Sequence, residues 1–340
     1  MLSVSPRSPS YLLLLWSLLL ACRMSAVTAD RPTSSTVLHD GVRLHYLEWR
    51  RPGPTLVFIP GLGDTAYVMS DFARRFSSQY HVIILTRRGF GRSGVPKEGY
   101  DLSTRTEDIR VMLDALAVKR AVLIGHSIAG DELTAFATRY PHRVAGLVYL
   151  DAAYDRADPE APKPTASVWS SITKACFGGD SDGAQRSLEA YRRSMKCLFF
   201  GIWSKGQEEN LRETTVVNID GTVSARTPSW VPREISEAAQ HEKVSLSSVH
   251  APALLLFARQ RMEKRGLVLD ETTRQGLVRD EDAYEAYFAR YQKKLRAQKN
   301  LQIVVLQQTL HHLYLEKPAE VEILIRRFLD DIRTAGQVAS

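Results

Sequence analysis

Short runs of apolar residues, many of them β-branched, recur along the chain. Runs of four to eight such residues between turn signals are typical of strands buried in a parallel sheet. The predicted strands are Val37–Leu38, Val42–Trp49, Thr55–Ile59, His81–Leu85, Ala121–Ile124, Val144–Leu150, Ala253–Phe257 and Gln302–Leu306. His39-Asp40-Gly41 separates the first two runs and is a turn signal, so we expect a hairpin at the N-terminal edge.

Helical segments lie between the predicted strands. They are Asp64–Ser78, Ser103–Val118 with Ser103 as N-cap, Ile128–Tyr140, Asp280–Lys299 and Pro318–Thr334. Alternation of this kind predicts a doubly wound α/β sheet with helices on both faces. The alternation stops between residues 152 and 250, a stretch that begins rich in proline and carries several aromatic residues. We expect a core of residues 30–151 and 251–340, with residues 152–250 inserted as a lid after the sixth strand.

The apolar run Tyr11–Cys22 is too short to span a bilayer, which needs about 20 residues. Its place near the N-terminus predicts an export signal. Val27-Thr28-Ala29 before Asp30 has the small-x-small pattern of a signal peptidase site, whereas Leu19-Leu20-Ala21-Cys22 resembles a bacterial lipobox, in which the cysteine is lipidated. We expect residues 1–29, or a shorter segment ending before Cys22, to be a signal. The mature protein is then periplasmic or secreted, or a lipoprotein anchored to a membrane at Cys22.

Cysteine and charge counts add to this picture. The three cysteines leave Cys176 and Cys197 as an even pair once Cys22 is assigned to the signal. An oxidising compartment favours a disulfide between them, and two free thiols are the alternative. The net charge of +7 comes from residues spread along the chain, and no basic stripe with aromatic residues appears. We therefore expect a small-molecule substrate and no nucleic acid as partner, and membrane contact only through the signal or a lipid at Cys22.

The segment Gly125-His126-Ser127-Ile128-Ala129-Gly130 follows a predicted strand and opens a predicted helix. A nucleophilic serine on a sharp strand-to-helix turn must adopt a strained backbone, and small neighbours let strand and helix pack closely around it. This position makes Ser127 a candidate nucleophile.

Four segments in this order resemble the α/β-hydrolase superfamily: Val57–Gly63, Arg87–Ser93, Gly125–Gly130 and His311–Pro318. Their order and spacing match from about residue 36 to 334, apart from the insertion. The resemblance implies an α/β-hydrolase fold, which is a mostly parallel, doubly wound sheet with an N-terminal hairpin and a lid. It also implies a serine hydrolase of the bacterial exported type.

The resemblance carries residue roles with it. In that superfamily the serine attacks an acyl carbon, a histidine takes its proton, and a carboxylate orients the histidine. The implied nucleophile is Ser127, and the implied base is His311, which stands seven residues before Pro318. The neighbouring His312 is expected to point elsewhere.

The acid departs from the family pattern, because no aspartate stands in the usual place after Ala253–Phe257. The candidates are Asp151, directly after Val144–Leu150, and Glu263. Asp151 is preferred, because some family members use an acid at this position.

The implied oxyanion hole uses the backbone N–H groups of Leu62 and Ile128. Pro60 replaces the histidine that usually opens this loop, but backbone donors do not depend on that side chain. Asp131 and Glu132 are expected to face the helix dipole in a structural role. No H-x-E, H-E-x-x-H or C-x-x-C spacing and no phosphate-binding glycine loop occurs, so we expect no metal and no cofactor.

The sequence thus predicts a serine hydrolase that cleaves an ester, or a related acyl bond, of a small to medium apolar substrate through an acyl-enzyme. The alternative is a lidded ligand-binding protein or receptor with negligible turnover on the same fold. The missing aspartate and Pro60 keep that alternative open, whereas the intact Ser127 and His311 argue against it.

Overall fold

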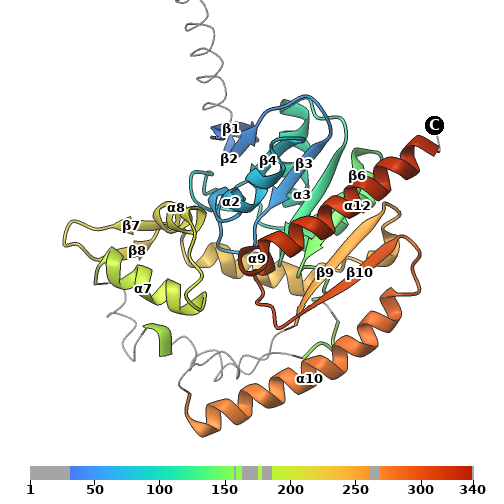
Figure 1. The fold of residues 1–340 in the computed structure, drawn as a ribbon. Helices are drawn as coiled ribbons and strands as arrows, with labels where there is room; N and C mark the ends of the chain where they lie inside the picture. The colour runs from blue at the N-terminus through green and yellow to red at the C-terminus, as the bar shows by residue number, and fades with distance from the viewer. Residues whose placement is uncertain (1–30, 157, 163–174, 178–185, 260–268, 339–340) are drawn as a thin grey trace, which may run out of the picture.

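The core of the protein is built on an eight-stranded sheet, in which the strand order is β1-β2-β4-β3-β5-β6-β9-β10 (Figure 1). The computed structural model describes residues 31–156, 158–162, 175–177, 186–259 and 269–338. The strands are β1 (Thr33–His39), β2 (Val42–Trp49), β3 (Thr55–Ile59), β4 (His81–Leu85), β5 (Ala121–His126), β6 (Val144–Leu150), β9 (Ala253–Arg259) and β10 (Leu301–Gln307). The strands from β4 to β10 in this order pair in parallel, whereas β2 runs antiparallel to β4. The predicted α/β-hydrolase fold is confirmed.

The hairpin at the edge follows from its turn. Strands β1 and β2 pair antiparallel with His39 opposite Val42, so only Asp40 and Gly41 form the loop. Both residues have positive φ, 48° and 77°. A two-residue loop of this conformation matches the right-handed twist of the strands.

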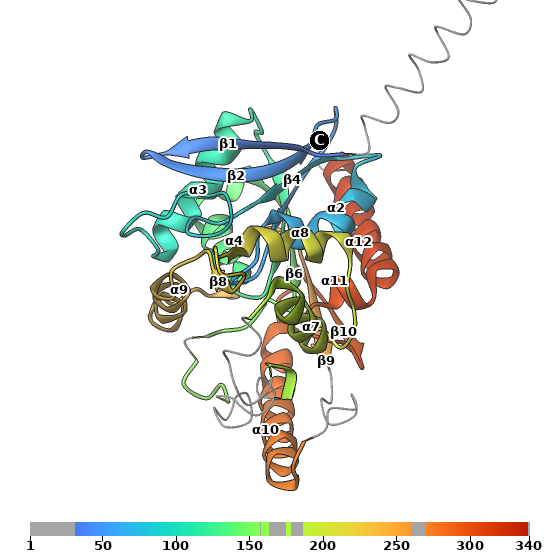
Figure 2. The same cartoon turned by 90° about the vertical axis from the view of Figure 1, so that its left-hand side faces the viewer.

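Helices cover both faces of the sheet and bury a separate apolar cluster on each. On one face lie α3 (Leu102–Ala115), α4 (Ala129–Arg139) and α10 (Glu271–Leu295). The other face is covered by η1 (Ala66–Met69), α2 (Ser70–Ala73), η2 (Arg74–Phe76), α11 (Leu313–Glu316) and α12 (Pro318–Val338). Figures 1 and 2 both place α10 at the end of the molecule opposite the β1–β2 hairpin.

Several helices begin at other residues than predicted, mainly because a capping residue lies ahead of the predicted start. Helix α3 begins after Asp101, whose carboxylate accepts from the Thr104 N–H at 2.8 Å, so Ser103 is not the N-cap. Helix α10 begins at Glu271, because Asp270 caps it. The helix expected over Asp64–Ser78 is three short helices instead.

The inserted residues form elements outside the eight-stranded sheet. They are α7 (Leu188–Leu198), α8 (Lys205–Thr214), β7 (Thr215–Val217), β8 (Val223–Ala225), α9 (Trp230–His241) and η4 (Leu246–Ser248). A disulfide joins Cys176 to Cys197 of α7, with Cα atoms 5.4 Å apart. Asn210 of α8 accepts from the backbone N–H of Thr65 at 2.8 Å and donates to Asp64 at 3.0 Å. These bonds hold Asp64 and Thr65 outside the short helices.

Within the described residues, every helix is too short or too polar to cross a membrane. The predicted signal, residues 1–29 with Cys22, lies outside the described residues.

Candidate functional site

Ser127 lies on a tight turn between β5 and α4. Its φ is +56°, in the left-handed region that residues other than glycine rarely adopt. A Cβ at Gly130 would come within 1.8 Å of the Ala152 carbonyl oxygen, and one at Gly125 within 2.7 Å of the Leu133 side chain. Glycine at both positions therefore allows the close packing of strand and helix that holds Ser127 in its strained turn.

The structure brings His311 and Asp151 together, although 160 residues separate them in the chain. His311 follows β10 and Asp151 follows β6, and Nδ1 of the imidazole lies 2.6 Å from Oδ2 of the carboxylate. Because an ionised carboxylate only accepts, Nδ1 is the donor and Nε2 carries the lone pair. His311 can therefore take a proton at Nε2 while Asp151 fixes its ring.

Two further donors hold Asp151, and neither was predicted from the sequence. Oδ1 accepts from the backbone N–H of Ala258 at 3.0 Å and from the hydroxyl of Tyr154. The side chain of Asp151 is 8% exposed, whereas that of His311 is 46% exposed. Asp151 is therefore the buried, fixed partner of this pair. The alternative acid, Glu263, lies outside the described residues.

The loop after β3 lies directly against the Ser127 turn. A Cβ at Gly61 would be 2.9 Å from Nδ1 of His126 and 3.5 Å from Cβ of Ser127. Gly61 immediately precedes Leu62, and Ser127 immediately precedes Ile128. The two predicted oxyanion residues are therefore carried by segments that touch each other.

A buried ion-pair network supports this loop and was missed in the sequence. Glu132 accepts from Nε and Nη2 of Arg87, both at 2.7 Å, and from Nη1 of Arg105 at 2.9 Å. Arg87 also donates to the carbonyl oxygens of Pro60 and Gly61, at 3.0 and 3.1 Å. Arg87 thus connects the helix after Ser127 to the loop that carries Leu62.

The charges in this network are compensated. Burial alone would raise the pKa of Glu132, but the charges and hydrogen bonds of Arg87 and Arg105 together outweigh it, and the pKa lies below its usual value. Glu132 is 1% exposed and Arg87 is 2% exposed. Glu132, for which a helix-dipole role was expected, is thus also the acceptor of a buried ion pair.

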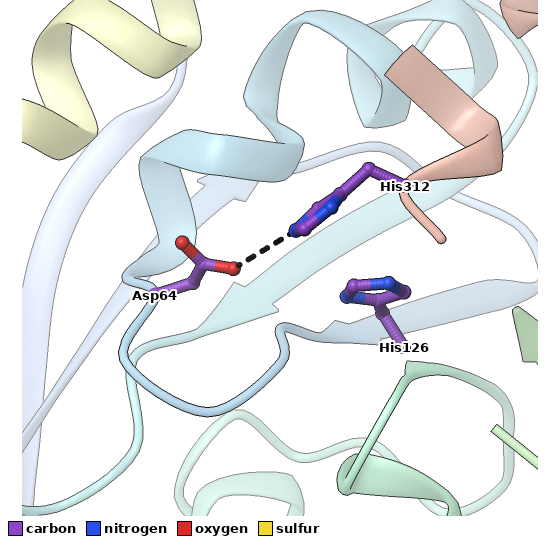
Figure 3. Close-up of side chains that lie close together, drawn as sticks. All are labelled: Asp64, His126 and His312. Carbon is purple, nitrogen blue, oxygen red and sulfur yellow. Dashed lines mark ion pairs between the residues drawn. The ribbon is translucent and has the colours of Figure 1, made fainter. Parts of the chain in front are cut away.

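Asp64, His126 and His312 form a second polar cluster beside Ser127 (Figure 3). One possible ligand atom from each lies within 4.8 Å of the others, and Nε2 of His312 is 3.7 Å from Oδ2 of Asp64. His312 thus interacts with Asp64, while His311 pairs with Asp151. Burial, followed by the nearby His311 and His312, holds the pKa of His126 well below its usual value. The cluster has the chemistry of metal ligands, which no local sequence spacing indicated.

An apolar cluster joins the insertion to the predicted oxyanion residues. Its buried members are Phe90, Tyr100, Ile128, Val231, Ile235 and Ala239, with Leu62 and Trp230 packed against them. Val231, Ile235 and Ala239 belong to α9 of the insertion. The segments around Ser127 therefore border an apolar region contributed by both core and insertion.

The comparisons with known proteins agree with this fold. A family model described as the alpha/beta hydrolase fold matches residues 54–181. Over 116 residues, or 33% of this chain, the sequence is 37% identical to the non-heme chloroperoxidase of Streptomyces lividans. That match covers 42% of the chloroperoxidase, and a match at 32% identity covers 32% of mouse epoxide hydrolase 4, so the chain spans less than half the length of these two relatives.

Solved structures extend the likeness to nearly the whole chain. E-2-(acetamidomethylene)succinate hydrolase superposes with a TM-score of 0.63 at 18% identity, covering 88% of this chain and 99% of that one. A bacterial membrane phospholipase A superposes with a TM-score of 0.59 at 22% identity, covering 93% and 92%. At these identities the likeness is one of fold, and the resemblance inferred from the sequence motifs is confirmed.

Proposed function

Because the chain has the α/β-hydrolase fold, we propose that it is a serine hydrolase cleaving an ester, or a related acyl bond, of a small to medium apolar substrate. The observation that carries the proposal is the 2.6 Å contact between His311 Nδ1 and Asp151 Oδ2, on the strand ends beside the strained Ser127 turn. A buried acceptor that fixes the imidazole tautomer is what a general base for a serine needs.

The proposed reaction proceeds in two halves. Nε2 of His311 takes the proton of Ser127 Oγ as the oxygen attacks the acyl carbon, and the backbone N–H groups of Leu62 and Ile128 stabilise the resulting oxyanion. The imidazolium then gives its proton to the leaving alcohol, and the acyl-enzyme remains. Water, deprotonated by His311, attacks the acyl-enzyme and releases the acid and free Ser127.

The apolar substrate is proposed from the surroundings of the oxyanion residues. Leu62 and Ile128 belong to the apolar cluster shared with Val231 and Ile235 of α9. An acyl chain bound there would lose contact with water. Each methylene group buried in this way would make binding more favourable by roughly 0.8 kcal/mol. The relatives support a hydrolase, and the ester as the cleaved bond is our proposal.

Labelling with a fluorophosphonate tests the proposal. We expect the wild-type protein to be labelled, Ser127→Ala to be unlabelled, and His311→Ala and Asp151→Asn to react at least 100-fold more slowly. Glu263→Gln, the matched control for the acid, should react like the wild type. No labelling of a folded wild-type protein would refute the hydrolase and would leave a ligand-binding protein as the next hypothesis. Slowing by Glu263→Gln instead of Asp151→Asn would assign the acid to Glu263.

We also propose that the protein is exported. The disulfide between Cys176 and Cys197 supports an oxidising compartment, because cytosolic proteins seldom retain such bonds. Mass spectrometry of the mature N-terminus tests this. A chain beginning at Asp30, or at a modified Cys22, is expected, and an intact N-terminal segment on cytosolic protein would refute it.

A further inference from the structure

Three segments that come together beside Ser127 each contribute one potential metal ligand. Asp64 lies in the loop after β3, His126 is the last residue of β5, and His312 lies between β10 and α11. Figure 3 shows the carboxylate and the two imidazoles facing one another. Their ligand atoms already lie within 4.8 Å of one another.

The orientation of His126 leaves one of its nitrogens without a partner. Nε2 lies 3.1 Å from the carbonyl oxygen of His311 and must donate to it, because a carbonyl only accepts. Nδ1 therefore carries the lone pair. Among the described residues Nδ1 has no hydrogen-bond partner, although His126 is only 1% exposed. A buried lone pair beside a carboxylate and another imidazole is suited to a cation.

A second buried polar atom borders the same place. The ring centroid of Tyr314 is 5.2 Å from that of His126, and the Tyr314 hydroxyl has no hydrogen-bond partner in the described part of the chain. Asp64 is the charged neighbour that, after burial, raises the pKa of this hydroxyl. The hydroxyl is thus available to bond a ligand held between the three side chains.

We propose that Asp64, His126 and His312 form a binding site for a divalent transition-metal ion of the Zn²⁺ class. Two imidazoles and one carboxylate suit such an ion, whereas Mg²⁺ and Ca²⁺ prefer sets of oxygen ligands. Zinc binds nitrogen and oxygen at about 2.0–2.2 Å, so the side chains must draw in slightly on binding. Asp64 and His312, which are 14% and 24% exposed, have room to do so.

The surroundings of the site support its ligands. Asn210 donates to Oδ1 of Asp64 at 3.0 Å, which leaves Oδ2 facing His312. The Phe199 ring of the insertion packs edge-on against His312, with centroids 4.8 Å apart. Such outer contacts orient ligating side chains and limit the access of water.

A bound ion would tie together the segments that carry Leu62, Ser127 and His311. The importance of this connection for catalysis rests on the proposed function, whereas ion binding itself does not. An ion that binds only the folded protein raises its melting temperature through mass action. We therefore expect zinc to stabilise the protein whether or not the protein has hydrolase activity.

Calorimetric titration of untagged, chelator-treated protein with ZnCl₂, together with thermal unfolding, tests the site. We expect one ion per chain and a rise in melting temperature for the wild type. His312→Ala and Asp64→Asn should weaken binding at least tenfold, and MgCl₂ should give no binding. His250→Ala, which removes an exposed histidine, is the matched control and should bind zinc like the wild type.

Three outcomes would overturn the site. They are no stoichiometric zinc binding by the wild type, unchanged affinity in a folded His312→Ala variant, or equal loss in His250→Ala. Fluorophosphonate labelling of the zinc-free protein is measured separately, so failure of the metal site is distinguishable from failure of the serine hydrolase.

Discussion

Asp151 is held on both of its oxygens. His311 donates to Oδ2, while Ala258 and Tyr154 donate to Oδ1. Asp151 also has a positive φ of 47°, so its backbone as well as its side chain is constrained. A carboxylate fixed in this way positions the imidazole without a search among rotamers, which reduces the entropy lost on reaching the transition state.

Replacing Tyr154 with phenylalanine tests this positioning. The change removes one donor from Oδ1 and leaves the His311 contact in place. We expect kcat for an ester substrate to fall about tenfold with little change in KM. Losses of this size are typical when a residue that orients a functional side chain through a hydrogen bond is removed. Steady-state kinetics on a p-nitrophenyl ester would measure both constants.

Tyr140→Phe provides the control. Its hydroxyl also donates to a carboxylate, that of Glu107, at the far end of α4 from Ser127. It should leave kcat unchanged. Equal losses in the two variants would mean that Tyr154 acts through general stability rather than through Asp151.

At the scale of elements, Arg87 joins three segments of the core. It follows β4, pairs with Glu132 of α4, and donates to Pro60 and Gly61 in the loop after β3. The proposed oxyanion donors Leu62 and Ile128 lie on two of these segments. Their spacing therefore depends on a guanidinium group that bonds both segments at once.

Arg87→Lys should separate this positioning from charge. Lysine keeps the positive charge for Glu132 but lacks the planar fork that reaches two carbonyl oxygens and a carboxylate together. We expect kcat to fall roughly 10- to 100-fold, somewhat less than the loss of one oxyanion donor. The pH dependence of kcat should stay unchanged, because His311 and Asp151 are not touched.

Arg88→Lys is the matched control, since Arg88 is also buried and pairs with a carboxylate, that of Asp108, at 2.5–2.6 Å. Thermal unfolding should show comparable destabilisation of both variants, while only Arg87→Lys lowers kcat strongly. A similar loss of kcat in both would contradict a positioning role for Arg87.

The pattern of apolar residues predicted the strands well, because strands buried on both faces are apolar throughout. Predicted and observed bounds coincide for β2, β3, β4 and β6. Helix starts were less predictable, because Asp101 and Asp270 cap helices ahead of the expected positions. Thr65 caps the first of the short helices after Asp64, and its backbone N–H is bonded to Asn210, a residue of the insertion that no local pattern connects to it.

The candidate site shows the same division. Ser127 and Asp151 could be singled out because each follows a strand, and His311 because of its distance to Pro318. The contacts of Arg87 with Glu132, and of Asp64 with His312, could not be predicted. They join residues 45 and 248 positions apart, and only the folded sheet brings such residues together.

At the scale of the whole molecule, the insertion is attached to the core at several places beside the site. Helix α8 is bonded through Asn210 to Asp64 and Thr65, and α9 packs on the cluster that contains Leu62 and Ile128. The disulfide between Cys176 and Cys197 closes a loop within the insertion itself. The insertion therefore has a covalent constraint of its own in addition to its contacts with the core.

Replacing both cysteines with serine should loosen the insertion and leave the sheet intact. The bridge spans a sequence separation of 21 residues, for which chain entropy suggests about 3 kcal/mol, or roughly a hundredfold in an opening equilibrium. Native-state hydrogen exchange should then show α7 losing protection by up to that factor. Amides of β5 and β6 should keep theirs, because these strands are hydrogen-bonded to neighbouring strands on both sides within the sheet.

Which helices and strands lose hydrogen-exchange protection decides whether the insertion unfolds separately from the sheet or together with it. If only α7 and its neighbours in the insertion lose protection, the insertion opens as a cooperative unit separate from the sheet, as local unfolding of a lid requires. In that case KM for a medium-chain ester should rise, because α9 would pack against Leu62 for a smaller fraction of the time. Fluorophosphonate labelling of Ser127 would persist. Equal losses in α7 and β5 would instead mean that insertion and sheet unfold together, and substrate entry would then not depend on movement of the insertion.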